Sequence, residues 1–220
     1  MIVILVLVFE LMMLNACRHP DSLRDQGAAA LKGDPVGYDE SFKKLVNAGR
    51  YEDALHQVCE RFKLKCQNIS ISTAESTGSR AVTHPYTNHI VLYPGAFRFI
   101  GMPHPGWLAS IIEHENFHTT QSTYIRAVVV GAQARILGDR TYEAGVEYAA
   151  WEYQLKSAER FPLTCEMILE IEQQLYFYGK ILEKNGTGPR DDRDELENFT
   201  MPENQRQVVL RRCDLSRDPK

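Results

Sequence analysis

WLASIIEHENFHTTQ, at residues 107–121, is the stretch that decides how this chain folds, because its buried-type residues recur at helical spacing. The residues on the shared face follow one another at intervals of four, three, four and three: Trp107, Ile111, His114, His118 and Gln121. Residues at these intervals lie on one face of an α-helix. The sequence therefore predicts an amphipathic helix whose inward face carries both histidines.

The same stretch contains the pattern His-Glu-x-x-His, formed by His114, Glu115 and His118. Residues four apart stand one helical turn above each other, so both imidazoles can reach one ion at the Zn–N distance of about 2.0–2.1 Å. Glu115 would then lie beside the ion, where a carboxylate can hold a metal-bound water. A catalytic zinc takes three protein ligands and one water, so a third ligand has to come from elsewhere in the chain.

A downstream segment, TYEAGVEYAAW at residues 141–151, supplies two candidates for this third ligand. Glu143 and Glu147 are four residues apart and would lie on one face of a predicted helix. We favour Glu147, because the small residues around it would let two helices approach each other. Glu143 would then support one of the histidines by a hydrogen bond. The alternative, with Glu143 as the ligand, stays open on the sequence alone.

With these residues, the chain resembles the gluzincin-type zinc metallopeptidases, in which a glutamate from the next major helix completes a His-Glu-x-x-His site. The extended pattern His-Glu-x-x-His-x-x-Gln, ending at Gln121, and the alanine-rich run at residues 147–150 are similar to bacterial zincin-like domains. The resemblance covers roughly residues 68–160, and it implies a Zn²⁺ cofactor. The chain lacks the Asn-Glu-x-x-x-Asp form of the best-known gluzincins, so the motif does not choose between the two glutamates.

The activity that this resemblance implies is hydrolysis of peptide bonds. Zinc lowers the pKa of its water towards about 7, and Glu115 takes the proton of that water and returns it to the leaving amine. A donor for the oxyanion is also required, and the candidates are Tyr142, Tyr148, Tyr153 and His104. The predicted strand at residues 88–93 is either the sheet edge along which an extended peptide substrate lies, or an ordinary packed strand.

Two other functions remain as alternatives. One is a catalytically inactive zincin that binds metal and serves as a binding or assembly module in the cell envelope. The other is a structural protein whose two motif histidines are hydrogen-bonded core residues. As possible metal ligands, the isolated histidines His84, His89 and His104 are set aside and interpreted as structural, and the aromatic run at residues 176–178 is interpreted as core.

The pattern along the chain predicts an α+β fold. Residues 39–64 carry two short helical stripes, and residues 68–93 change to alternation and β-branched residues, which indicates a small, mostly antiparallel sheet of about three strands. From Gly106 the sequence is helical almost to Glu183, with breaks near residue 138 and at Pro162. The prediction is one zincin-like domain at residues 39–185, in which the sheet precedes a helical bundle that carries the zinc-binding helix.

The flanking segments predict an exported protein. Residues 2–14 are apolar apart from one glutamate, and as a helix they would span only about 20 Å of a ~30 Å hydrocarbon core. The following Leu-Asn-Ala-Cys, ending at Cys17, resembles a bacterial lipobox. We therefore expect a signal peptide at residues 1–17, a lipid anchor on Cys17, and a flexible tether at residues 18–38. No aspartate follows Cys17, which favours the periplasmic side of the outer membrane; cleaved secretion and a misread start are the alternatives.

The remaining cysteines and the charge bear on compartment and partners. The cysteines beyond the lipobox are even in number: Cys59, Cys66, Cys165 and Cys213. We favour pairing the first with the second and the third with the fourth, which would tie a polar C-terminal tail at residues 186–220 to the body; buried free thiols are the alternative. The net charge of -4 gives no reason to expect nucleic-acid binding. The expected partners are a peptide or protein substrate and membrane lipid, while the oligomeric state stays open.

Overall fold

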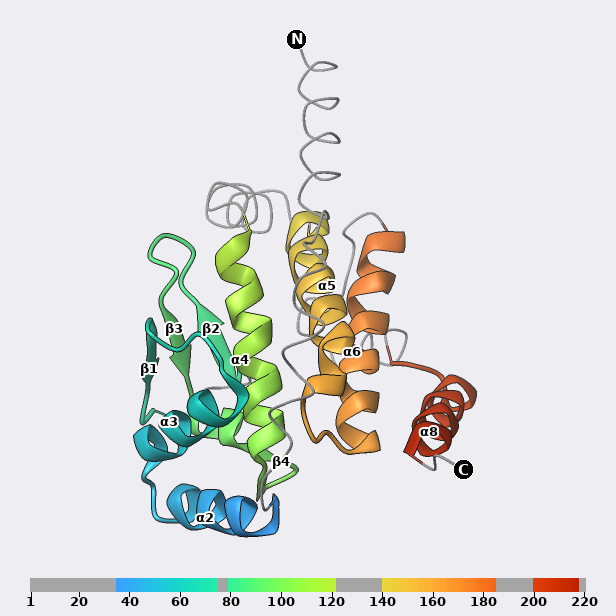
Figure 1. Cartoon of the computed structure of the whole chain (residues 1–220). Coiled ribbons are helices and arrows are strands. Elements are labelled where there is room, and N and C mark those ends of the chain that lie inside the picture. Colours follow the sequence, from blue (N-terminus) through green and yellow to red (C-terminus); the bar gives the residue numbers. More distant parts are fainter. Residues whose placement is uncertain (1–34, 75–78, 122–139, 185–199, 218–220) are drawn as a thin grey trace. The chain divides into compact units, whose positions relative to one another are not determined.

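The computed structural model describes residues 35–74, 79–121, 140–184 and 200–217 (Figure 1). The predicted signal peptide, Cys17 and most of the predicted tether lie outside these residues. The elements are α2 (Pro35–Asn47), α3 (Tyr51–Phe62), β1 (Ile69–Ile71), β2 (Ala81–Thr83), β3 (Ile90–Leu92), η2 (Pro94–Phe97), β4 (Arg98–Phe99), β5 (Met102–Pro103), α4 (Pro105–Thr120), α5 (Thr141–Lys156), η5 (Ala158–Arg160), α6 (Cys165–Glu183) and α8 (Glu203–Arg217). None of the helices in the described ranges has the length and apolar character needed to cross a membrane.

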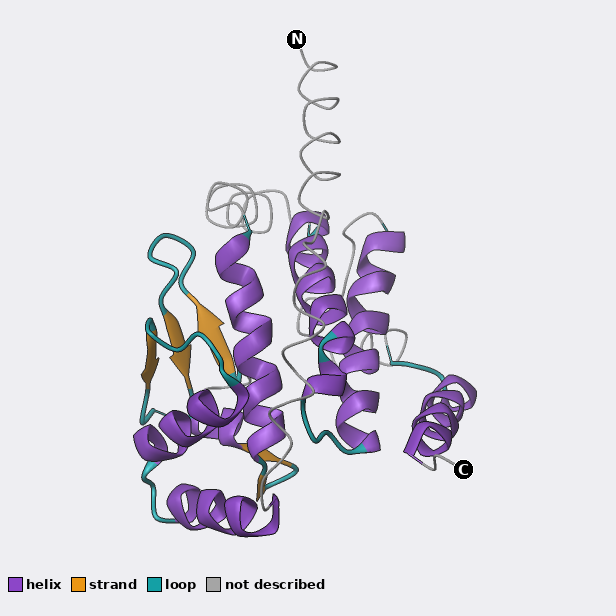
Figure 2. Cartoon of the chain, viewed as in Figure 1, coloured by secondary structure: helices purple, strands orange, loops and turns teal. Residues whose placement is uncertain are grey.

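The predicted α+β class is confirmed, with helices dominant and two small sheets (Figure 2). Two of the three strand pairings are antiparallel, namely β2 with β3 and β4 with β5, while β1 and β3 run parallel. Helix α2 begins at Pro35, inside the range predicted as tether. Proline favours the first turn of a helix, because its fixed φ suits the helix and its missing N–H would be unpaired there anyway.

The three-stranded sheet has the order β1-β3-β2, which makes β3 the central strand. Val91 lies opposite Ser70 on one side and opposite Val82 on the other, so β3 is paired along both of its edges. The hypothesis that the strand at residues 88–93 is the free edge is therefore wrong, and its alternative, an ordinary packed strand, holds. The edge strand that packs against α4 is β2 (Figure 1).

Helix α4 lies between the three-stranded sheet and the pair of helices α5 and α6 (Figure 1). Every residue from Pro105 to Glu115 is buried, so this part of the helix is enclosed on all faces. The sequence predicted an amphipathic helix with one inward face, whereas this part of α4 is buried on every face. Trp107, Leu108 and Ala109 follow one another around the helix and therefore point in three different directions, and all three are fully buried, as expected for a helix that is apolar all round.

Helix α5 packs against both α4 and α6, which places it where a residue from it can meet α4. Ala144 is fully buried and packs against Ile181 of α6, whereas the space around Gly145 is open. A buried hydrogen bond also joins α5 to α4, because the Gln154 amide donates to Ser110 Oγ at 3.0 Å. A polar contact thus joins α5 to α4, while the small side chain of Ala144 faces α6.

Both predicted disulfides form, Cys59–Cys66 and Cys165–Cys213, and the alternative of free thiols is set aside. The second joins the first residue of α6 to α8, a helix within the range predicted as a polar tail. Val209 of α8 is buried and packs with Leu169 and Met201. This helix is therefore attached to α6 by one covalent bond and a small apolar cluster.

The two disulfides should differ in their contribution to stability. The cysteines of the Cys165–Cys213 bond are 48 residues apart in the sequence, and those of the Cys59–Cys66 bond are 7 residues apart. Loop-closure entropy then predicts that the Cys165→Ser/Cys213→Ser variant loses about 4 kcal/mol and the Cys59→Ser/Cys66→Ser variant about 2 kcal/mol. Urea denaturation of both double variants beside the wild type measures this difference. An equal loss in the two variants would contradict the expectation.

Candidate metal centre

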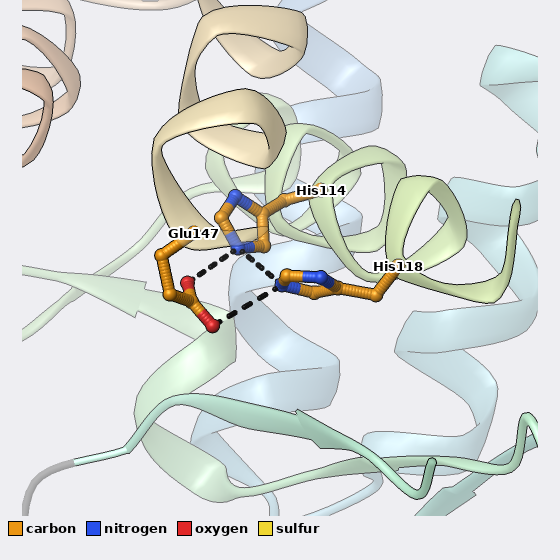
Figure 3. Close-up of side chains that lie close together, drawn as sticks. All are labelled: His114, His118 and Glu147. Carbon is orange, nitrogen blue, oxygen red and sulfur yellow. Dashed lines mark hydrogen bonds and ion pairs between the residues drawn. The ribbon is translucent and has the colours of Figure 1, made fainter. Parts of the chain in front are cut away.

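Three side chains from α4 and α5 converge on one point (Figure 3). The Nε2 atoms of His114 and His118 are 3.1 Å apart. Each of them also lies 3.5 Å from an oxygen of Glu147, His114 from Oε2 and His118 from Oε1. Both imidazoles are buried, and the Glu147 side chain is 28% exposed. The two histidines from successive turns of α4 and the glutamate from α5 thus bring their donor atoms together.

These separations fit a metal ion. In a tetrahedral site with ligand distances of about 2.0–2.1 Å, neighbouring donor atoms lie about 3.3 Å apart. The three observed separations, 3.1, 3.5 and 3.5 Å, lie close to that value. Two histidines and a glutamate are also a donor set found in catalytic zinc sites. The group of His114, His118 and Glu147 could therefore hold a metal ion, with the carboxylate reaching the solvent-accessible side.

Nearby carboxylates make this point attractive to positive charge. Burial lowers the pKa of His118, but Glu147, Glu115 and the Gln121 amide outweigh it and raise that pKa to about 9. Burial raises the pKa of Glu147, but the two imidazoles outweigh it and hold that pKa well below its usual range. The pair thus favours a charged carboxylate facing a cation, and a bound metal ion would compete with protons for the imidazole nitrogens.

Glu143, the alternative third ligand, has a different partner. Its carboxylate accepts two hydrogen bonds from the Arg140 guanidinium, at 3.0 and 3.1 Å. The structure therefore brings Glu147 rather than Glu143 to the two histidines. The predicted support of a histidine by Glu143 is likewise replaced by its pairing with Arg140.

Comparison with known proteins adds no relative. Protein-family models, curated proteins and solved structures were all searched, and none matches the chain. The candidate metal centre therefore rests on its own geometry.

Gln121, which the helical spacing places on the same face as the two histidines, has a definite position in the site. His118 Nδ1 lies 2.8 Å from Gln121 Oε1, and the Gln121 amide nitrogen donates to the carbonyl of Val146 at 3.0 Å. That carbonyl can only accept, so the amide nitrogen must face it and the amide oxygen must face His118. In its neutral form, which a metal ion would bind, His118 then carries its proton on Nδ1 and presents Nε2 to the ion.

The other two motif residues are held by β2 and α5. Thr83 Oγ1 lies 2.5 Å from Glu115 Oε2, so a hydroxyl from the edge strand fixes the glutamate carboxylate. The His114 ring packs against the Trp151 ring, with centroids 4.4 Å apart. The Nδ1 atom of His114 is buried without a hydrogen-bond partner among the described residues, so this ring is directed by its packing against Trp151 and by the contacts of its Nε2 atom with His118 and Glu147.

A cleft of about 610 Å³ gives access to the three donors. Residues on and beside β2 form one wall, and α5 and α6 form the other, with His114, Glu115 and His118 of α4 between them. In the described chain, none of the four predicted oxyanion donors lines this cleft. His104 instead caps α4 through the Trp107 N–H, and Tyr153 contacts Glu113.

Among the described residues, Tyr178 of α6 is the tyrosine that lines the cleft. It also packs against Ala144 and Ile181, in agreement with the interpretation of residues 176–178 as core. Burial raises the pKa of its phenol, and the carboxylates of Glu147 and Glu143 raise it further. Its hydroxyl therefore stays protonated and can donate a hydrogen bond. The sequence around Tyr178 gives no local signal that this residue lines the cleft, because it lies more than 50 residues beyond the motif. Only the packing of α6 on α5 brings it there.

The histidines interpreted as structural behave accordingly in the described chain. His89 Nε2 lies 2.7 Å from Ser70 Oγ, which joins β1 to the turn before β3. His84 contacts the Tyr86 ring, with centroids 5.9 Å apart. Neither belongs to the group of donors that could hold a metal ion.

Replacing Gln121 should weaken metal binding without unfolding the protein. Gln121→Ala removes both of its hydrogen bonds, and the zinc affinity should fall about 10–100-fold, the usual effect of losing such a partner. Gln121→Glu keeps an acceptor for His118 Nδ1 and should lose less. Competition with a chromophoric chelator measures the affinities, with the exposed Thr120→Ala as the matched control on the same helix. Unchanged zinc affinity in Gln121→Ala would exclude this role.

Proposed function

We propose that this protein is a zinc-dependent metallopeptidase whose metal ligands are His114, His118 and Glu147. The observation that carries the proposal is the convergence of these three donors at zinc-like separations, with Glu115 beside them in an open cleft. A zinc ion bound there would acidify a water molecule and polarise the scissile carbonyl. Peptide hydrolysis needs both effects together with a base.

Glu115 is the general base in this proposal. Its Oε2 atom accepts the Thr83 hydroxyl at 2.5 Å, which orients the carboxylate and directs the other oxygen, Oε1, to proton transfer. The same side chain would return the proton to the leaving amine. A carboxylate that is buried, oriented and next to three metal-binding donors is suited to this work.

Tyr178 is the donor that we assign to the oxyanion. Its phenol lines the cleft and has a raised pKa, so it offers an O–H to a developing negative charge. The four tyrosine and histidine candidates from the sequence do not offer this from their places in the described structure. The assignment makes α6 part of the proposed active site.

The edge strand β2 is the surface on which an extended peptide would lie. Ala81, Val82 and Thr83 all line the cleft, and the side chain of Val82 is exposed. Pairing through backbone groups would accept many sequences, while Thr83 would bring the bound peptide next to Glu115. The role is thus proposed for β2, whereas the sequence had offered the strand at residues 88–93 as one of two alternatives.

A catalytically inactive metal-binding module remains the second candidate. It would use the same three donors, but it would not need Glu115 held by Thr83. The two disulfides are compatible with an extracytoplasmic protein, which suits either candidate. The lipid anchor at Cys17 and a place in the bacterial envelope remain predictions from the sequence.

Glu115→Gln separates the enzyme from the inactive module. The substitution keeps the size of the side chain and the hydrogen bond to Thr83, but it removes the base. We expect equal zinc content in both proteins and at least a 100-fold loss of cleavage of a mixed peptide library. Zinc-loaded wild type that cleaves nothing in the library would favour the inactive module.

The third ligand is tested by a matched pair of variants. Glu147→Gln removes a carboxylate that faces both histidines, so zinc affinity should fall by a factor of 100 or more. Glu143→Gln removes a carboxylate of the same chemistry that is paired with Arg140, and zinc affinity should change by less than about three-fold. Both are measured by chelator competition. The reverse order of effects would make Glu143 the ligand.

A further inference from the structure

A polar cluster that contains one ion pair lines the same cleft away from the metal centre, and the proposed reaction does not use it. It consists of Arg80, which precedes β2, together with Glu170 and Gln174 of α6. The Arg80 guanidinium lies over the Trp107 ring, 4.9 Å from its centroid. Trp107 precedes His114 by two turns of α4, or about 10 Å along the helix axis. The cluster therefore lies at one end of the cleft.

The Arg80 side chain is held in place, but its contacts do not use all of its hydrogen-bond donors. Its Nη1 atom is 3.4 Å from Glu170 Oε1, which is a long contact, and its side chain is 37% exposed. The same Glu170 oxygen also accepts from the Gln174 amide at 3.4 Å. A guanidinium has five N–H donors in a flat fork, so most of them remain for another acceptor. Stacking on Trp107 keeps the guanidinium oriented so that it can bind a further acceptor.

The charges along the cleft suggest which acceptor this is. Arg80 is the sole lysine or arginine among the described residues that line the cleft, whereas the lining glutamates are Glu115, Glu143, Glu147 and Glu170. A negatively charged ligand group would be repelled at most points of this wall and attracted at Arg80. Guanidinium and carboxylate match in shape and can form two parallel hydrogen bonds.

We propose that Arg80 binds a carboxylate of the peptide substrate and thereby positions the substrate in the cleft. This inference rests on the proposed peptidase function for the identity of the ligand. An extended chain advances about 3.3 Å per residue, so the carboxylate would lie about three residues from the scissile bond. Glu170 competes with that carboxylate for Arg80, and it keeps the guanidinium from binding anions without discrimination.

The rival explanation is that Arg80 and Glu170 form only a structural tie between the sheet and α6. A pair of variants separates the two explanations, because they predict opposite signs. Arg80→Met removes the charge and keeps an apolar stem over Trp107, so a preference for carboxylates should disappear. Glu170→Gln leaves Arg80 in place and removes its competitor, so the same preference should increase. A structural tie predicts that both variants have the same small effect on stability and none on preference.

The measurement is binding of three peptides of equal length to the zinc-loaded Glu115→Gln protein. One peptide has a free C-terminal carboxylate, one is amidated, and one is amidated but carries a glutamate at the corresponding position. Both tryptophans of the chain are close to the cleft, Trp107 under Arg80 and Trp151 in its lining, so intrinsic fluorescence should report binding. We expect the peptides with a carboxylate to bind about ten-fold or more tightly than the amidated one.

The outcomes are separable from those of the proposed function. The two carboxylate peptides distinguish a chain end from an acidic side chain as the source. Equal binding of all three peptides, or a preference that survives Arg80→Met, overturns the assignment of Arg80. If the preference is present and changes with the two variants, but the wild type cleaves no peptide, the binding site stands and the peptidase proposal fails. In an active enzyme, Arg80→Met should raise KM for carboxylate peptides with little change in kcat.

Discussion

Burial of α4 on every face from Pro105 to Glu115 is the constraint on which the site depends. A helix enclosed in this way can neither rotate nor slide without breaking apolar contacts on all sides, so the directions of its side chains are fixed. The motif lies where the helix leaves the core, since the residues after Glu115 become partly exposed apart from His118. The imidazoles can therefore be buried, rigid and still open to a cleft.

Polar groups placed this deep require partners, and the partners come from separate elements. β2 supplies Thr83 for Glu115, and α5 supplies Glu147 for both histidines. The end of α4 supplies Gln121, whose second hydrogen bond reaches the α5 backbone one residue before Glu147. Each residue of the candidate metal centre is thus positioned by a contact between elements, and the proposed metal binding and catalysis would both require such preorganisation.

The parts of the site that were predictable are those encoded over a short range. The helical spacing of His114 and His118 follows from the period of the α-helix, and the pairing of Cys59 with Cys66 joins two cysteines only 7 residues apart in the sequence. Residues that reach the cleft through long-range packing were not predictable in this way. Tyr178 lies in an aromatic run that is interpreted as core, and Arg80 belongs to no local pattern that indicates a binding site.

The sequence by itself determined that two imidazoles stand one turn apart, that a glutamate lies between them, and that a helix with two further glutamates follows. It also determined the α+β class, through the change from alternation to helical periodicity. Only the tertiary structure decided that Glu147 rather than Glu143 meets the histidines, and that β2 rather than β3 is the edge strand beside α4. The reason is physical: periodicity defines the faces of one element, whereas the rotation of one helix against another and the order of strands depend on packing between distant parts of the chain.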